Sequence, residues 1–457
     1  MSEHDNDPLG FNRRDFLRGG SLATVMTMLG GVELLAQTNA APGGETASQK
    51  PKVKVGVIGL WTRGREIVNT LALLEQADVA AICDTYPAAL KRAASAAPNA
   101  TQTEDYKTIL ANKDIPAVII ATPTATHKEI ALAALKAGKD VYCEAPLANT
   151  IEDARVIALA AKASKLHVFQ AGLQMRADPL RIFLLPFVRS GQLGKMAEAR
   201  AQWHKKTSWR SSSPNPEREK ALNWRLDKAI SLGLVGEVGI HAIDQAGWYL
   251  GSPPTAITGF GSITFWNDGR EVPDTVQLVL EFPNGIRMLY DATLANSFDG
   301  DYEMLYGSDA AMMMRESKAW MFKEVDSPAF GWEVYASKTQ FYKETGIALV
   351  ADASKAKPAT PQPTPGQDTP LANTPLYYAL QNFLANSVAF KTTTDDYKAS
   401  YGADDLDGLA DQLSKVARKP AADYLEGFQS VVTAVKANEA IASGKRIELK
   451  PEWYELK

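Results

Sequence analysis

The chain has 457 residues, of which 45% are hydrophobic and 22% charged, as in ordinary soluble proteins, and its length exceeds what one hydrophobic core usually supports. Its formal net charge of -4 at pH 7 argues against a nucleic-acid partner, which needs a basic face. Beyond the N-terminal region no stretch has the roughly 18 consecutive apolar residues of a membrane span.

The N-terminus has the order of features found in an export signal. Arg13 and Arg14 form a twin-arginine pair, an apolar stretch follows over residues 21–36, and small residues suited to a signal peptidase come next. These features predict a periplasmic or otherwise exported protein that uses the twin-arginine export machinery. The alternative is an amphipathic N-terminal helix of the mature protein. Glu33 within the apolar stretch favours that alternative, and several glycines disfavour it.

Short β-rich runs then alternate with helical runs. The predicted strands cover residues 53–58, 79–83, 117–121, 141–143 and 167–171, and the predicted helices cover residues 63–74, 88–96, 125–137 and 151–164. The first and third strands are near-continuous apolar runs, which is typical of parallel strands buried on both faces. The alternation predicts an α/β fold with a Rossmann-type, doubly wound parallel sheet.

The turn after the first predicted strand carries a partial dinucleotide-binding fingerprint. Gly59 and Gly64 occupy the first and third glycine positions of a G-x-G-x-x-G motif, and Trp61 stands at the middle one. Asp84 ends the next strand, where a carboxylate can accept hydrogen bonds from ribose hydroxyls, so NAD is favoured over NADP. A helix that begins near Arg63 would direct backbone N–H groups at the pyrophosphate. Taken alone, this fingerprint also fits a domain without nucleotide, because Trp61 would either block the pyrophosphate or stack on the ligand.

After residue 172 the pattern changes to a helix over 179–190 and β-rich segments over 196–203, 256–265, 275–282 and 286–293, with a hairpin turn at 283–285. This predicts an α+β domain with a large, mainly antiparallel open sheet. One face of such a sheet must be covered, so a homo-oligomer is expected. Helices are predicted over 376–390, 406–418 and 421–443, and the polar residues 391–402 are interpreted as an insertion between two of them.

The predicted organisation follows from these changes of pattern. It comprises a signal peptide (1–41), a spacer (42–51), a dinucleotide-binding Rossmann domain (52–172), an α+β substrate and oligomerisation domain (173–350), a Pro-rich loop (351–375) and a C-terminal helical segment completing the fold (376–457). Cys83 and Cys143 are expected to be buried free thiols.

Five motifs along the chain resemble, in the same order, those of the Gfo/Idh/MocA family of sugar-type dehydrogenases. They are ATPTATH (121–127), AGKDVYCEAPL (137–147), GLQMRADP (172–179), GEVGIHAID (236–244) and AVKANEAIASGK (434–445). The resemblance runs from residue 53 to 457, apart from insertions between about 320 and 420. It implies an NAD(P)-dependent oxidoreductase. It also implies a cofactor site that includes the 59–64 turn, Asp84 and five residues of the later motifs: Thr122, Pro123, His127, Glu144 and Pro146.

His241 is the predicted acid/base. Glu237 lies four residues earlier, so on a helix the two side chains share a face and the carboxylate can orient the imidazole. Hydride removal from an alcohol carbon needs a group that takes the hydroxyl proton, and histidine suits this step. The family usually has Asp at the Glu237 position. The alternative is a core histidine satisfied by its carboxylate.

Ala145 departs from the family. Its position is that of the lysine in the family's E-K-P motif, which assists proton transfer, and alanine has no titratable group. Loss of such a group typically costs roughly 10²–10⁴ in rate unless another group replaces it. Lys205, Lys206 and Tyr302 are the candidate replacements.

Arg176, Trp203 and His204 are the predicted substrate residues, with Trp209 and Trp224 nearby in the chain. Indole faces beside basic groups suit a sugar ring, although core packing also explains each tryptophan taken singly. No metal site is predicted.

Three functions therefore stand open. The first is an exported oxidoreductase that acts on a sugar or sugar derivative with tightly bound NAD. The second is a redox-neutral, NAD-dependent enzyme that cleaves glycosides. The third is a non-catalytic sugar-binding protein, which Trp61 and Ala145 favour.

Overall fold

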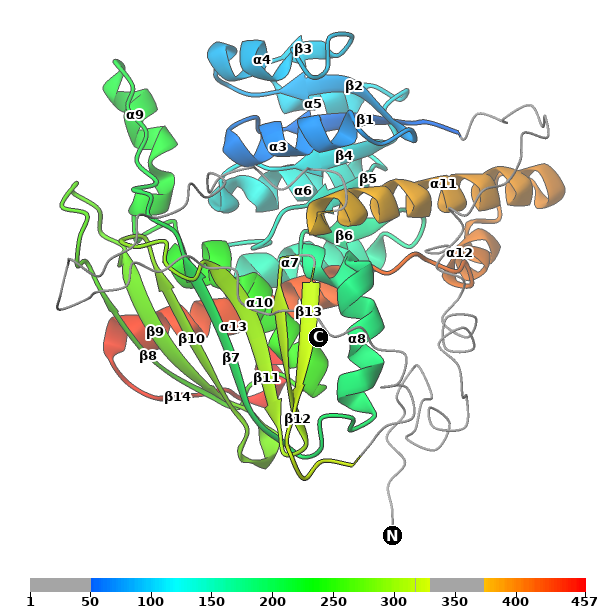
Figure 1. The fold of residues 1–457 in the computed structure, drawn as a ribbon. Helices are drawn as coiled ribbons and strands as arrows, with labels where there is room; N and C mark the ends of the chain where they lie inside the picture. Colours follow the sequence, from blue (N-terminus) through cyan, green and yellow to red (C-terminus); the bar gives the residue numbers. More distant parts are fainter. Residues whose placement is uncertain (1–50, 317, 329–373) are drawn as a thin grey trace, which may run out of the picture.

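The computed structural model describes residues 51–316, 318–328 and 374–457. The predicted signal peptide, nearly all of the spacer and nearly all of the Pro-rich loop lie outside these residues. Figure 1 shows two layered parts, an upper sheet flanked by helices and a lower, larger sheet with helices on one face.

The upper part is a six-stranded parallel sheet in the order β3-β2-β1-β4-β5-β6, as predicted. Its strands are β1 Val53–Ile58, β2 Ala77–Cys83, β3 Thr101–Thr103, β4 Ala117–Ile120, β5 Asp140–Cys143 and β6 Phe169–Ala171. Its helices are α3 Thr62–Leu71, α4 Pro87–Ala93, α5 Tyr106–Ala111, α6 His127–Lys136 and α7 Ile151–Ala163. β1 and β4 are almost wholly buried because helices cover both faces.

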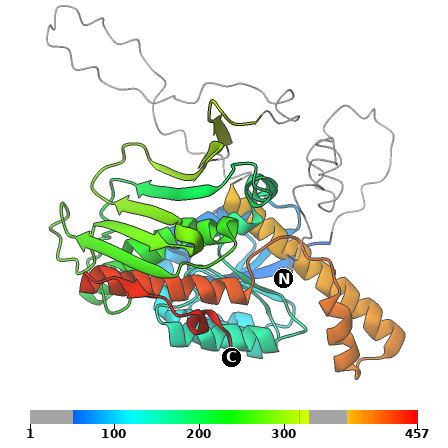
Figure 2. The same ribbon diagram turned by 90° about the horizontal axis from the view of Figure 1, so that it is seen from below.

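The lower part is an eight-stranded sheet in the order β13-β12-β11-β7-β10-β9-β8-β14. Its strands are β7 Met196–His204, β8 Ala256–Ser262, β9 Thr275–Glu281, β10 Arg287–Thr293, β11 Asp301–Gly307, β12 Ala310–Arg315, β13 Lys318–Lys323 and β14 Ile447–Glu448. β7 and β10 pair in parallel and the other neighbours are antiparallel, so the mainly antiparallel prediction is confirmed. Helices α8 Pro179–Arg189, α10 Ile240–Leu250 and α13 Tyr424–Ser443 lie on one face (Figure 2).

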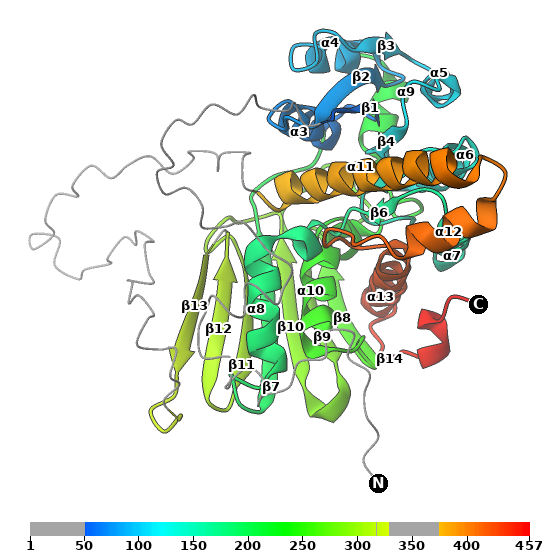
Figure 3. The same ribbon diagram turned by 90° about the vertical axis from the view of Figure 1, so that its right-hand side faces the viewer.

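The C-terminal helices connect the two parts. α13 packs between α7 and β8, whereas α11 Pro375–Tyr401 lies against α3 of the dinucleotide domain (Figure 3). The proposed insertion at 391–402 is wrong, because α11 continues through almost all of this polar segment. The segment is exposed and needs no apolar face to remain helical, and Lys391 pairs there with Asp395 one turn later. The shorter α12, Leu406–Ser414, follows.

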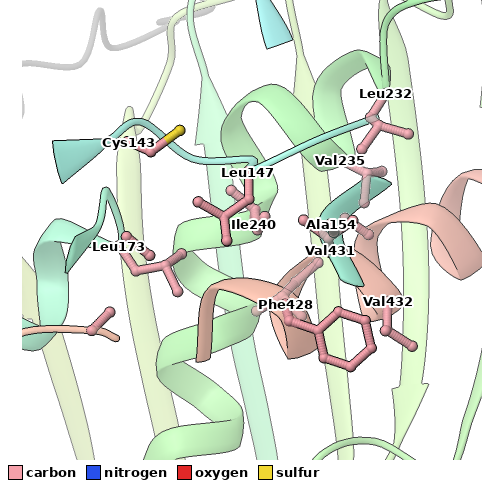
Figure 4. Packing of buried hydrophobic residues seen from close by; sticks show 14 of the residues in the cluster. Cys143, Leu147, Ala154, Leu173, Leu232, Val235, Ile240, Phe428, Val431 and Val432 are labelled. Carbon is pink, nitrogen blue, oxygen red and sulfur yellow. The ribbon is translucent and has the colours of Figure 1, made fainter. Parts of the chain in front are cut away.

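The core spans both parts. Figure 4 shows side chains of the parallel-sheet domain meeting those of the second domain and α13, among them Cys143, Leu147, Leu173, Leu232, Val235, Ile240, Phe428 and Val431. Cys83 and Cys143 are buried free thiols, as predicted. In the described ranges, no helix combines the length and apolar character needed to cross a membrane.

Candidate active site

The turn between β1 and α3 has the geometry of a nucleotide-binding turn. Gly59 has φ +91°, and a Cβ there would lie 2.6 Å from the Ala121 carbonyl oxygen. A Cβ on Gly64 would lie 1.8 Å from the Gly59 carbonyl oxygen, so only glycine fits. The turn therefore brings the start of α3 directly to the carboxyl edge of the sheet, where helix N–H groups can bind a pyrophosphate.

Asp84 lies at the same edge. Its Oδ2 accepts a hydrogen bond from the Leu60 N–H and its Oδ1 from the Tyr86 N–H, both at 2.8 Å. The carboxylate is thus fixed beside the turn, where a dinucleotide's ribose would lie. The Trp61 ring lies 5.9 Å from the Arg92 guanidinium of α4. These residues fit a dinucleotide.

Arg63 links the turn to the middle of the sheet edge. Its guanidinium donates hydrogen bonds to Glu144 Oε1 at 3.1 Å, Glu66 Oε2 at 2.9 Å and Gln174 Oε1 at 2.7 Å. Burial alone would lower the pKa of Arg63, but the Glu144 and Glu66 carboxylates raise it. Burial raises the pKa of Glu144, and Arg63 opposes that shift. Arg63 is therefore a permanent positive charge held inside the site.

His127 begins helix α6. Its side chain is buried, with Nδ1 3.0 Å from the Pro146 carbonyl oxygen and Nε2 2.9 Å from that of Thr122. Both ring nitrogens are engaged by backbone carbonyl oxygens, and a contact between His127 and a cofactor stays a prediction. The imidazole instead ties the loop of Thr122 and Pro123 to the segment that follows β5. Pro146 is buried and follows a cis peptide bond from Ala145.

His241 lies in the first turn of α10. Its Nδ1 is buried and has no hydrogen-bond partner among the described residues. Burial and the positive charge of Arg63 lower the pKa of His241 to about 4. The imidazole is therefore neutral at physiological pH, with a nitrogen free to exchange a proton with a ligand.

Glu237 does not orient His241. It lies in a π-helical turn, Val235–Gly239, which precedes α10, and such turns are frequent at functional sites. Glu237 Oε2 lies 3.6 Å from Arg225 Nε, and its Oε1 lies 3.4 Å from Thr124 Oγ1. Burial raises the pKa of Glu237 to about 7, although Arg225 opposes the shift. The predicted pair fails because Arg225, 12 residues earlier, takes the carboxylate.

None of the three proposed substitutes for the missing lysine enters this site. Lys205 and Lys206 are exposed, and the Lys206 ammonium lies 5.2 Å from the Phe265 ring. Tyr302 pairs with Gln202 in the sheet register and lies under Arg315. The cation whose charge acts on His241 is Arg63.

The predicted substrate residues do not form one group. Trp203 and His204 are consecutive in β7, so they point to opposite faces of the sheet. Trp203 packs on the core, whereas His204 Nε2 contacts Asp291 at 2.5 Å. Arg176 binds Asp244 with two hydrogen bonds of 2.9 Å and also pairs with Glu426. Protein carboxylates bind both Arg176 and His204, and the assignment of these two residues to substrate binding stays a prediction.

Two tryptophans lie around Arg225, beside Glu237. The Arg225 guanidinium lies 4.7 Å from the Trp224 ring and 6.0 Å from the Trp209 ring. Sequence reasoning missed Arg225, Gln174 and Thr124. The one sequence feature that could have identified Arg225 as a site residue is its position directly after Trp224. In the described part of the chain, no cluster of three or more His, Cys, Asp or Glu side chains is arranged to hold a metal.

Two family profiles match the chain. One is described as "Oxidoreductase family, NAD-binding Rossmann fold" and matches residues 53–171, and the other, the GFO/IDH/MocA C-terminal domain, matches residues 186–312. Among solved structures, a levoglucosan dehydrogenase in complex with NADH and levoglucosan is similar, with TM-score 0.61 and 20% identity over 87% of this chain and 99% of that chain. An oxidoreductase domain protein from Kribbella flavida has TM-score 0.61 and 18% identity, over 88% and 100% of the two chains. These likenesses support the fold.

Three curated proteins are related in sequence. Levoglucosan dehydrogenase of Pseudarthrobacter phenanthrenivorans is 33% identical over 33% of this chain and 36% of its own length. Inositol 2-dehydrogenase 2 of Saccharopolyspora erythraea is 29% identical over 51% of this chain and 64% of its own length. A glycosyl hydrolase family 109 protein of Shewanella amazonensis is 27% identical over 47% of this chain and 50% of its own length. The chain thus spans between about one third and two thirds of the length of these relatives.

Proposed function

Because the chain belongs to the Gfo/Idh/MocA family of NAD-binding oxidoreductases, we propose that it oxidises a hydroxyl-bearing carbon of a sugar or sugar derivative with tightly bound NAD. The observation that carries this proposal is the neutral, unpartnered Nδ1 of His241 at the edge of the sheet where Gly59, Gly64 and Asp84 would hold a dinucleotide. The named substrates of two relatives, levoglucosan and inositol, support the sugar class.

Each group of the site has a separate role in the proposed reaction. The nicotinamide, when bound, supplies the acceptor for hydride. His241 takes the hydroxyl proton, and it can do so because burial and Arg63 keep it neutral. The fixed charge of Arg63 acts on His241, and such a charge can stabilise negative charge that develops on a substrate oxygen without depending on proton transfer. Trp209, Trp224 and Arg225 offer aromatic faces and a cation for the sugar ring.

The proposal is tested by mass spectrometry of the purified protein for bound nicotinamide dinucleotide and by calorimetry with NAD and NADP. Bound dinucleotide, tighter binding of NAD than of NADP, and NADH formation with levoglucosan or inositol are the expected results. Protein that carries no dinucleotide and binds none in the calorimeter would refute the proposal.

A second candidate is glycoside cleavage through a redox-neutral cycle. The glycosyl hydrolase family 109 relatives favour it. It predicts cleavage of an aryl glycoside without net NADH, lost in His241→Ala. A non-catalytic sugar-binding role predicts instead that sugar binding does not depend on NAD and that Ala145→Lys changes no turnover.

Export and self-association belong to the same proposal. The twin-arginine motif at Arg13 and Arg14 supports transport of the folded, cofactor-loaded protein. The face of the eight-stranded sheet opposite the helices exposes apolar side chains, including Phe260 and Leu289, and supports a homo-oligomer. Fractionation of cells that express the full chain, and its mass in solution, test these two points.

The pH profile follows from the pKa of His241. A base whose pKa is lowered stays neutral until the pH falls to that pKa, so kcat/KM should fall only as the pH approaches about 4. An ordinary histidine would give this loss near pH 6.5. A change near pH 7 that disappears in Glu237→Gln would report the Glu237 carboxyl. Initial rates with a sugar substrate between about pH 4 and pH 7 measure the loss due to His241 and the change due to Glu237. A loss of kcat/KM near pH 6.5 would contradict the assignment of His241 as the base.

A further inference from the structure

One helix of the second domain reaches the dinucleotide domain. Helix α9, Pro216–Leu222, rises from the eight-stranded sheet to the level of β1 and β4 (Figures 1 and 3). Its segment is held in shape by local bonds: Glu219 pairs with Arg210 at 3.0 Å, and the Asn223 side chain bonds both the N–H and the carbonyl oxygen of Ser211. α9 itself buries no residue, so its position does not serve a core.

Arg218 is the residue of α9 that makes the contact. Its guanidinium carbon lies 4.1 Å from the centre of the Tyr86 ring, and Nη2 lies 3.8 Å from Asp84 Oδ1. The side chain is only 21% exposed. The Arg218 guanidinium thus lies against the Tyr86 ring and near the Asp84 carboxylate, which is the group expected to bind the ribose.

The donors of Arg218 are unused. Nε is buried without a partner, and within the described ranges the guanidinium donates no hydrogen bond. Asp84 already accepts one backbone N–H on each oxygen, and 3.8 Å exceeds hydrogen-bond length. A buried donor without an acceptor is costly, so its retention indicates a ligand that supplies oxygen atoms.

We propose that Arg218 is a dinucleotide-binding residue contributed by the second domain, which binds the oxygen atoms of the adenosine ribose and closes this end of the site. The inference rests on the proposed function, since it takes NAD as the ligand. Asp84 binds the ribose hydroxyls from the side of the sheet, and Arg218 covers them from the side of α9. Contacts from both sides of the ribose would slow release of the cofactor.

Calorimetry on the full chain tests this proposal. Charge-assisted hydrogen bonds contribute enough that Arg218→Ala should weaken NAD binding roughly 10- to 100-fold. Adenosine monophosphate should lose affinity in the same variant, whereas nicotinamide mononucleotide should not. NADP measured in parallel locates the contact: an equal loss assigns it to the ribose hydroxyls, and a larger loss to the position of the 2′-phosphate.

Lys220→Ala is the matched control, because Lys220 is an exposed cation on the same helix, and its NAD affinity should not change. Tyr86→Ala should weaken NAD binding as Arg218→Ala does, and the double variant should be little worse than either. NAD affinities of Arg218→Ala and the parent protein that agree within error would overturn the inference. If the parent protein binds no NAD, the proposed function fails instead.

Discussion

His241→Ala is expected to lower kcat for oxidation of a sugar hydroxyl about 10²- to 10⁴-fold, the usual loss when a proton-transfer group is removed. NAD affinity should stay close to that of the parent protein, because the turn of Gly59 and Gly64 and the Asp84 carboxylate lie on other elements. Steady-state kinetics together with calorimetry separate the two effects.

His204→Ala is the matched control for that variant. His204 belongs to the same domain, yet it points to the sheet face opposite Trp203 and contacts Asp291 and the Phe298 carbonyl oxygen. Its removal should leave kcat essentially unchanged. A loss of less than roughly tenfold in His241→Ala would exclude His241 as the base.

Arg63→Met is expected to destabilise the fold by about 3 kcal/mol. Breaking a buried ion pair costs about 3–5 kcal/mol, and the lower end applies because 24% of the Arg63 side chain is exposed. The variant leaves Glu144 buried without its cation and Gln174 without its donor. Urea unfolding measures the change in free energy.

The double variant Arg63→Met, Glu144→Leu should recover much of this stability, since no uncompensated charge then remains. Lys91→Met on α4 serves as a control, because Lys91 is an exposed cation. If Arg63→Met unfolds at the same urea concentration as the parent, the ion pair contributes nothing to the fold.

The order of elements could be predicted because apolar runs and glycines mark them locally. Strands β1 and β4 are continuous apolar segments, and Gly59 follows β1 directly. β3 was missed because Thr101–Thr103 is a short, mostly exposed edge strand without an apolar pattern. α11 was cut short because its second half is polar and exposed.

The candidate site could be predicted only where a motif fixes a position. Gly59, Asp84 and His241 are named on this ground, and their roles in binding and catalysis stay predictions. Contacts over long sequence separations could not be found, since nothing local links Arg63 to Glu144, 81 residues later. Trp203 and His204 do not lie together, because consecutive side chains of a strand point to opposite faces of the sheet.

The place of α11 has a consequence for synthesis of the chain. Its Phe383 packs edge-on against Tyr142, and the Ala379 carbonyl oxygen accepts a hydrogen bond from Gln170, 209 residues earlier. Helices α3 and α4 cover part of the same face of the parallel sheet, but the part around Tyr142 and Gln170 stays uncovered until the second domain and α11 have been made. Contacts so distant in sequence form late, so this part of the apolar face is exposed in the nascent protein.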